Sequence, residues 1–376
     1  MNNFIEFWEN LGENKYLFLF AGVFFLYHLV SVLYKCLLIC SKEKKIPQEE
    51  KEGVSVIITS NNRAEELRKN LPYFLNQEDT NFEVIVVDEC SEDETQEVLT
   101  EMQKKYSQLR TTRIFPETKF RSTKKLAINI GILAARYDVL LFSEINCCPA
   151  SSHWVSAMRT YFTPDTAVVL GYANYTAPNG KVKIRRMFRF LRYLKMFLLV
   201  KRRCFVLGDG HNMGYRKKYY LAKKGFSKNS QSYTGYDNEM VACLSALGKV
   251  KVAKQEETYV NLKDSEKKTW KEDYTYYYQN KLKWPIKALI RSDFDTFIEF
   301  LFYIFCFILI FKHVLYIYII ACILLTFLLD FITINICLRH LKQRKLFLIS
   351  FIVSSIGFLY RWYYNVHSIF TKKKWR

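Results

Sequence analysis

The chain has 376 residues, of which half are hydrophobic and 16% are aromatic, and its formal net charge is +20. This length allows one large domain or two small ones. The apolar residues are concentrated in a few long runs with Lys and Arg clusters beside them, which excludes nucleic-acid binding as the simplest explanation of the charge and favours a membrane protein.

The first apolar run covers residues 16–40 and is long enough to span a bilayer. Acidic residues, among them Glu9 and Glu13, precede this run, and no small-residue cleavage site follows it. Both features argue against a signal peptide. We therefore predict a retained N-terminal transmembrane anchor over residues 1–45.

After a charged linker the sequence alternates between short β-branched runs and segments with helical spacing. The predicted strands are 54–59, 82–88, 111–115 and 138–143. The predicted helices are 63–77, 91–108 and 124–137, the second of which begins with a capping-box pattern at Ser91 and Glu94. This alternation predicts an α/β domain with a mainly parallel, Rossmann-like central sheet over residues 54–265.

Polar residues follow three of the predicted strands, where ligands of parallel sheets bind. These strand ends carry Thr59 and Asn61, then Asp88 and Glu89, then Glu144 and Asn146. Further along, residues 181–203 mix basic and apolar residues at near-helical spacing. Such a helix either lies in the headgroup layer of a membrane or packs on the domain with its basic face in water.

The last part of the chain is apolar again. We predict an amphipathic or gating segment over 266–293 and a membrane region of two or three helices over 294–376. The run 294–337 is split by Lys312 and His313, and the run 346–360 either spans the membrane or lies in its interface. The basic clusters beside these runs place the central domain in the cytosol.

Three stretches of the central domain share a pattern with a known family. They read "VIVVDECSEDET" (84–95), "GDGHNMGYRKKYY" (208–220) and "TGYDNEMV" (234–241). In this order and with the flanking apolar spans, they resemble the family 2 glycosyltransferases with a GT-A fold, and most closely the membrane-anchored bacterial members.

The resemblance implies a nucleotide-sugar donor, either a UDP-sugar or a GDP-sugar. Asp88 then contacts the base or ribose of the nucleotide, and Lys124 reaches a phosphate. The full set of donor-binding residues that the resemblance implies is Thr59, Asn61, Asp88, Glu89, Lys124, Asn129, Gly131 and Asn212.

The segment "SEINC" (143–147) occupies the place of the family's Asp-x-Asp motif, which holds a divalent cation on the donor diphosphate. The resemblance therefore assigns Glu144 and Asn146 as ligands of Mg²⁺ or Mn²⁺. One carboxylate and one neutral amide oxygen replace two carboxylates, so we expect the cation to bind weakly.

The family's general base lies in the stretch 234–241. Here Tyr236 replaces the first acid, Asp237 fits the second, and Glu239 is the alternative. A base at this position removes a proton from the acceptor hydroxyl as that hydroxyl attacks the sugar.

Taken together, these features indicate an inverting glycosyltransferase in the bacterial inner membrane, with its catalytic domain in the cytosol. Its acceptor would be a cell-surface glycan or a lipid-linked glycan in polysaccharide or cell-envelope biosynthesis, and no nucleic acid is involved. The altered motifs leave a second hypothesis open, a catalytically degenerate member that acts as a scaffold in glycan assembly. A synthase that also exports its polymer is a third, but it needs more membrane helices than the sequence offers.

Overall fold

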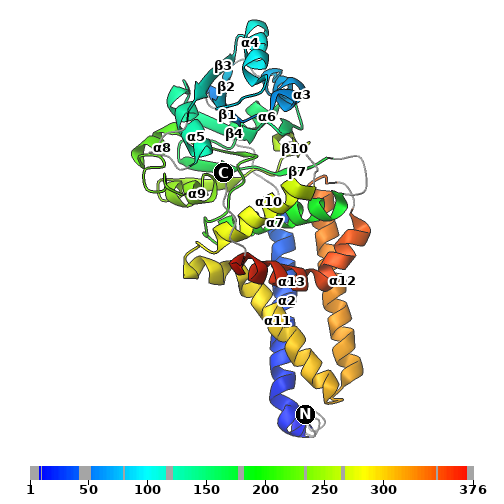
Figure 1. The fold of residues 1–376 in the computed structure, drawn as a ribbon. Helices are drawn as coiled ribbons and strands as arrows, with labels where there is room; N and C mark the ends of the chain where they lie inside the picture. The colour runs from blue at the N-terminus through cyan, green and yellow to red at the C-terminus, as the bar shows by residue number, and fades with distance from the viewer. Residues whose placement is uncertain are drawn as a thin grey trace. The chain divides into compact units, whose positions relative to one another are not determined.

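Figure 1 shows the computed structural model of the chain, which describes residues 8–9, 11–41, 52–78, 81–115, 122–176, 182–232, 235–263, 267–343 and 346–370. The chain forms two compact units. One is drawn from Met1–Glu43 and Pro285–Phe370, and the other from Lys44–Trp284. This division is made from contacts between residues and does not test the domain boundaries predicted from the sequence, which stay a prediction.

The second unit is built on a seven-stranded sheet in the order β3-β2-β1-β4-β8-β6-β9. Its strands are β1 (Val54–Ser60), β2 (Phe82–Glu89), β3 (Leu109–Ile114), β4 (Val139–Glu144), β6 (Thr166–Leu170), β8 (Met213–Arg216) and β9 (Lys249–Val252). Four of the pairings are parallel, and only β8 runs antiparallel to its neighbours β4 and β6. The mainly parallel central sheet predicted from the sequence is confirmed.

The strands β1, β2 and β4 are almost continuous apolar runs because both of their faces are covered. A second sheet has three short strands in the order β5-β10-β7, which are β5 (Cys147–Pro149), β10 (Val260–Leu262) and β7 (Ala173–Tyr175). β5 begins three residues after β4 ends, so the "SEINC" segment forms the turn between the two sheets.

Helices connect the strands in the expected alternation. They are α3 (Ala64–Leu75), α4 (Thr95–Lys105), α5 (Thr123–Ala134), α6 (Trp154–Arg159), α7 (Lys183–Lys201), α8 (Lys217–Ala222), α9 (Asn238–Leu244) and α10 (Lys267–Lys281), with a short 3₁₀ turn η3 (Glu256–Thr258). α5 packs against β1 and β2, and α4 packs against β3. The carboxyl ends of β1 and β4 lie at the N-terminal end of α5, where Lys124 contacts Glu144 and shares a pocket with Thr59.

The capping box predicted at Ser91 is wrong. α4 begins at Thr95, four residues later than the pattern predicted. Asp93 accepts hydrogen bonds from the backbone N–H and the hydroxyl of Thr95, while the N–H of Ser91 donates to the Asp88 carboxylate. The polar residues after β2 thus bond to one another in a tight loop, and they do not form a first helical turn.

The basic segment 181–203 forms α7, whose apolar face is buried in the second unit. The buried side chains are Met187, Arg189, Phe190, Tyr193, Leu194, Met196, Phe197 and Leu199. This burial supports the interpretation of a helix packed on its domain. An interfacial helix would instead keep that face for lipid.

The first unit consists of η1 (Gly12–Asn14), α2 (Lys15–Cys40), α11 (Ile286–Phe311), α12 (Tyr316–His340) and α13 (Phe347–Phe370). Three of the described helices, α2, α11 and α12, are long and apolar enough to cross a membrane. Outward-facing apolar side chains such as Leu37 and Phe307 are more than two-thirds exposed, as expected for lipid contact. The N-terminal run predicted as an anchor forms one apolar helix, α2. The later run forms two apolar helices, α11 and α12, on either side of Lys312 and His313.

Polar side chains link the helices of this unit. The Tyr27 hydroxyl donates to Asp295 at 2.6 Å, and the Lys35 ammonium lies 3.1 Å from the same carboxylate. His28 lies 3.4 Å from Asp330. Ionisable groups on apolar helices are costly unless they are paired, so these contacts favour one particular packing of α2 against α11 and α12.

Candidate functional site

The polar ends of three neighbouring strands lie side by side, as the sequence predicted. Ser60 of β1 is in register with Asp88 of β2, and Thr59 of β1 is in register with Glu144 of β4. Parallel strands bring these residues to one edge of the sheet. The edge therefore combines hydroxyl and carboxylate groups from three strands.

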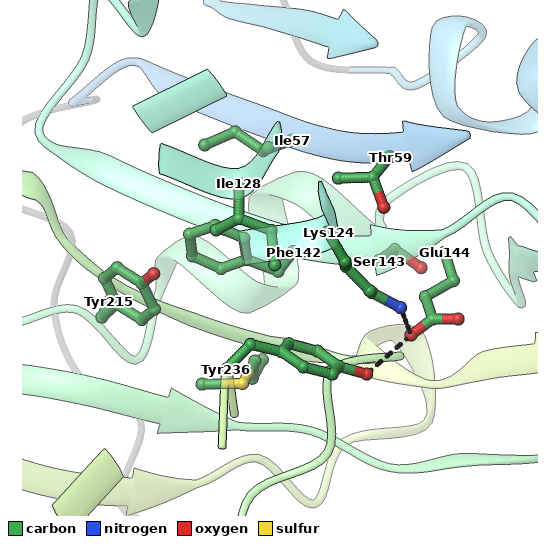
Figure 2. A pocket seen from close by; sticks show the side chains of 11 residues that line it. Ile57, Thr59, Lys124, Ile128, Phe142, Ser143, Glu144, Tyr215 and Tyr236 are labelled. Atoms are coloured by element: carbon green, nitrogen blue, oxygen red, sulfur yellow. Dashed lines mark hydrogen bonds and ion pairs between the residues drawn. The ribbon is translucent and has the colours of Figure 1, made fainter. Parts of the chain in front are cut away.

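A pocket opens at this edge (Figure 2). Its polar lining consists of Thr59, Ser143, Glu144, Lys124 from the first turn of α5, and Tyr236. Figure 2 shows the Lys124 ammonium and the Tyr236 hydroxyl converging on the Glu144 carboxylate. The floor of the pocket is apolar, with Ile57, Ile128, Phe142, Met213 and Tyr215 contributing to it.

Glu144 is the centre of these contacts. Its Oε1 lies 2.5 Å from Lys124 Nζ and accepts a hydrogen bond from the Tyr236 hydroxyl at 2.9 Å. Its Oε2 lies 3.8 Å from Nε2 of His211. Burial alone would raise the pKa of Glu144, but Lys124 and His211 lower that pKa to about 2. Burial likewise opposes the charge of Lys124, yet Glu144 outweighs it and raises the lysine pKa.

His211 joins the pocket to a buried ion network. Its Nδ1 lies 2.6 Å from Asp209, and Asp209 lies 2.6 Å from Arg189 of α7. Asp273 of α10 completes the network at 2.5 Å from Arg189 and 3.0 Å from Arg192. Burial would raise the pKa of Asp209, but Arg189 and His211 hold it well below its usual range.

The candidate base Asp237 lies just before α9 and is only 2% exposed. Its Oδ1 accepts a hydrogen bond from the N–H of Asn238 at 2.7 Å and from the Tyr276 hydroxyl of α10 at 3.0 Å. Burial raises the pKa of Asp237, and the Asn238 N–H, Arg192 and Tyr276 offset only part of that rise. A carboxylate with a raised pKa is a better proton acceptor.

Glu239 is bound differently from Asp237. Asn229 donates a hydrogen bond to its Oε2, and a Cβ at Gly235 would come within 2.3 Å of its carboxyl carbon. Gly235 also has φ +91°, a conformation that suits glycine. The glycine of the "TGYDNEMV" stretch therefore makes room for the Glu239 side chain, and Asp237 is the acid that α10 covers.

Asp88 is completely buried and is already hydrogen-bonded. It accepts from the N–H of Ser91 at 3.1 Å and from the Gln96 side chain, and Arg113 lies 3.5 Å from its Oδ2. Glu89 accepts a hydrogen bond from Thr123 at 3.1 Å, and its burial raises its pKa. Both acids thus lie at the predicted edge of the sheet. Each already has a hydrogen-bond partner from the same domain.

Four of the predicted donor-binding residues make structural contacts. Asn61 donates to the carbonyl of Glu89, and Asn129 accepts from the Tyr220 hydroxyl at 2.8 Å. A Cβ at Gly131 would lie 2.7 Å from Ile57, so this glycine lets α5 approach β1 closely. Asn212 donates to the carbonyls of Tyr172 and Thr258 and accepts from Trp154. None of the four lines the pocket.

Sequence reasoning missed His211, Arg189 and Asp209. His211 lies between Gly210 and Asn212 in the "GDGHN" stretch. Its position inside that stretch was the one feature of the sequence that could have indicated a role at the site. Arg189 was one of many basic residues in a segment with helical spacing. Nothing local distinguished it from its solvated neighbours, because its partners come from distant parts of the chain.

The expected divalent cation does not fit the residues at its predicted site. Glu144 Oε1 is already paired with an ammonium, and Asn146 is buried with its Oδ1 facing the thiol of Cys147 at 3.2 Å. Within the described ranges no three His, Cys, Asp or Glu side chains form a group that could hold a metal ion. Mg²⁺ and Mn²⁺ favour several charged or carbonyl oxygens, which this pair does not offer.

We compared the chain with protein-family models, curated proteins and solved structures. Residues 55–221 match the family model described as Glycosyl transferase family 2. No curated protein matches the chain. Among solved structures, the chain is similar to the mannosyltransferase PcManGT from Pyrobaculum calidifontis in complex with GDP-Man and Mn²⁺, with a TM-score of 0.57 and 13% identity over 92% of this chain and 99% of that chain.

The chain is also similar to S. aureus TarS, with a TM-score of 0.42 and 12% identity over 65% of each chain. For TarS in complex with UDP-GlcNAc the TM-score is 0.41 and the identity 14%, over 64% of this chain and 69% of that chain. The likeness to PcManGT is one of fold.

Proposed function

We propose that the chain is a family 2 glycosyltransferase that transfers a sugar from a nucleotide-sugar donor to a glycan or lipid-linked acceptor. Residues 55–221 match the model of that family, and the fold is similar to that of PcManGT. One observation carries the proposal. Lys124 and Glu144 line a pocket at the carboxyl ends of β1 and β4, and the buried carboxylate of Asp237 follows directly after Tyr236, which lines the same pocket.

On the donor side, the nucleotide lies over the ends of β1 and β2, with Asp88 toward its base or ribose. Arg113 and Gln96 now hold Asp88, so a bound nucleotide would share or replace their contacts. Lys124 lies at the start of α5, where a helix N-terminus and an ammonium together favour a diphosphate. A UDP-sugar and a GDP-sugar are the two donor classes proposed, and the shared fold with a structure that holds GDP-Man supports the second.

On the acceptor side, Asp237 acts as the general base. It accepts the proton of the acceptor hydroxyl while that oxygen bonds to the anomeric carbon, and the bond from that carbon to the diphosphate oxygen breaks with both electrons leaving on the diphosphate. Attack from the face opposite the leaving group inverts the anomeric configuration. The raised pKa of Asp237 supports this role.

The three candidate spans support membrane attachment. The basic clusters that flank these spans favour a cytosolic catalytic domain, and we assign the chain to a bacterial inner membrane on that argument. Attachment keeps the cleft close to an acceptor that is itself held in the bilayer.

One observation favours the scaffold alternative. Asp237 is covered by Tyr276, and Glu144 is paired with Lys124, so both altered motifs are occupied by the protein's own side chains. A degenerate member would keep these contacts permanently. An active enzyme would open them when donor and acceptor bind.

Donor turnover by the detergent-purified full chain tests the proposal. UDP- and GDP-sugars are supplied with a membrane lipid extract as acceptor, and the release of nucleoside diphosphate is measured beside transfer of labelled sugar to lipid. We expect one donor to be consumed by the wild type and at least 100-fold more slowly by Asp237→Asn, since general base catalysis contributes about 10²–10⁴-fold. Nucleotide binding without release or transfer, for every donor and with lipid extract present, would support the scaffold.

A further inference from the structure

We propose that Lys124 supplies the positive charge that balances the donor diphosphate, so that transfer by this chain needs no divalent cation. The inference rests on the proposed function and names the group that recognises the leaving group. It follows from the contacts of Glu144, the residue at the position of the expected metal ligand.

The Glu144 carboxylate is already paired with the ammonium group of Lys124. Lys124 Nζ lies 2.5 Å from Oε1, and the Tyr236 hydroxyl donates to the same oxygen at 2.9 Å. A divalent ion needs its oxygen ligands at about 2.0–2.6 Å. An ion bound to Oε1 would therefore lie against the ammonium, where like charges repel strongly in a partly buried site.

The remaining oxygen of Glu144 and the side chain of Asn146 do not provide the missing metal ligands. Oε2 of Glu144 faces Nε2 of His211 at 3.8 Å, and His211 is tied through Nδ1 to Asp209. The side chain of Asn146 is buried beside the Cys147 thiol. The site thus offers one half-used carboxylate, whereas the Asp-x-Asp motif that it resembles offers two.

The Lys124 ammonium is held in a fixed position. Its Nζ lies 4.6 Å from the centre of the Tyr236 ring, in addition to its contact with Glu144. The ring itself needs Gly210, because a Cβ there would come within 2.5 Å of it. Tyr236, which replaces the first acid of the family's stretch, therefore positions a cation by ring and hydroxyl together.

The position of Lys124 suits a diphosphate. It is the second residue of α5, and the hydroxyl side chains of Thr59 and Ser143 line the same pocket. An ammonium has three N–H donors, so it can bond Glu144 and a phosphate oxygen at once. As the bond from the anomeric carbon to the diphosphate breaks, Lys124 stabilises the charge that gathers on the leaving oxygen.

Nucleotide binding with and without a chelator tests the inference. UDP and GDP are titrated calorimetrically into the detergent-purified full chain in EDTA and again in MnCl₂. The variants are Lys124→Ala, Lys124→Arg and Glu144→Gln, with Lys104→Ala as the matched control because Lys104 is an exposed lysine on α4. Thermal melting of each variant in the same detergent separates loss of binding from loss of fold.

We expect the wild type and the Lys104→Ala control to bind the same nucleotide about equally in EDTA and in MnCl₂. Lys124→Ala should weaken binding about tenfold or more, the usual size for a lost charged hydrogen bond, and Lys124→Arg should keep most of the affinity. Glu144→Gln is the sharpest arm, since it releases Lys124 and should strengthen binding, whereas loss of a metal ligand would weaken it.

Two results would overturn the inference. Binding that disappears in EDTA, returns with Mn²⁺ and is lost in Glu144→Gln would show a metal site, and the proposed function would stand. No binding of either nucleotide by folded wild type, with or without Mn²⁺, would overturn the proposed function and the inference with it.

Discussion

Two opposing effects act on the pKa of Asp237. Its burial raises its pKa, while the hydroxyl of Tyr276, the N–H of Asn238 and the charge of Arg192 lower it. The charge of Asp209 adds to the rise. Because the rise prevails, Asp237 takes up a proton at a higher pH than an ordinary aspartate. Its protonation state therefore sets the acidic limit of activity in the proposed mechanism.

Replacing Tyr276 by Phe should move that limit. The substitution removes a hydrogen bond that favours the ionised carboxylate, so the pKa of Asp237 rises further. Only the ionised form can accept a proton, so kcat/KM should fall off at a higher pH in Tyr276→Phe than in the wild type. The pH profile of kcat/KM measures this shift, with Tyr274→Phe on the same helix as control. An unchanged acid limb would remove Asp237 from the role of base.

Asn212 belongs to the framework of the domain. Its amide makes three buried hydrogen bonds, to the carbonyls of Tyr172 and Thr258 and with the indole of Trp154. Asn212→Ala leaves these groups without a partner, which should cost about 3 kcal/mol of unfolding free energy. Denaturant unfolding of the detergent-purified chain measures the loss, with the exposed Asn76→Ala as control. A variant as stable as the wild type that fails to bind nucleotide would instead make Asn212 a donor ligand.

For single residues, the sequence predicted which strand ends lie together but not the contacts that their side chains make. Thr59, Asp88 and Glu144 were identified because they follow buried strands, and strand periodicity is a local property. The roles of Asn129 and Asn212 could not be predicted, because Tyr220 and Trp154, which contact them, lie 91 and 58 residues away in the chain. The same holds for the pairing of Lys124 with Glu144.

Among the elements, α10 has the most direct connection to the site. It carries Tyr276, which covers Asp237, and Asp273, which bridges Arg189 and Arg192 of α7. The two ion pairs of Asp273 are only slightly exposed, so each charge depends on its partner. We infer that the Asp273 bridge fastens α10 over Asp237. The gating role that the sequence predicts for residues 266–293 stays a prediction.

Asp273→Asn should loosen α10. Arg189 keeps Asp209, but Arg192 loses its ion pair, so the segment should open more often. Hydrogen–deuterium exchange should become at least several-fold faster in peptides covering α10, while α4 exchanges as in the wild type. Unchanged protection of α10 would mean that its aromatic contacts alone hold it in place.

The elements themselves were largely predictable, and their ends less so. β1, β2 and β4 were found because buried parallel strands are uninterrupted apolar runs. The start of α4 was misplaced because Asp93 and Ser91 satisfy polar groups of the loop before it. The sequence of α7 left two interpretations open, since burial of its apolar face depends on the rest of the domain.

The whole molecule combines an α/β unit with a unit of long apolar helices. Positive charge beside the spans predicts that the turn around His313 lies outside and that Gln343 lies in the cytosol. Alkaline phosphatase fused after His313 should be active in a bacterial host, and the same reporter fused after Gln343 should be inactive. The reverse pattern would place the catalytic domain outside the cell.

A structure of the full chain with UDP or GDP bound, determined in EDTA, would show directly whether Lys124 holds the diphosphate without a divalent cation. We expect the diphosphate against Lys124 at the carboxyl ends of β1 and β4, with the base or ribose toward Asp88. It also predicts an acceptor-side opening at Asp237. A nucleotide bound elsewhere on the chain, or a diphosphate held away from Lys124, would exclude the proposed role of Lys124.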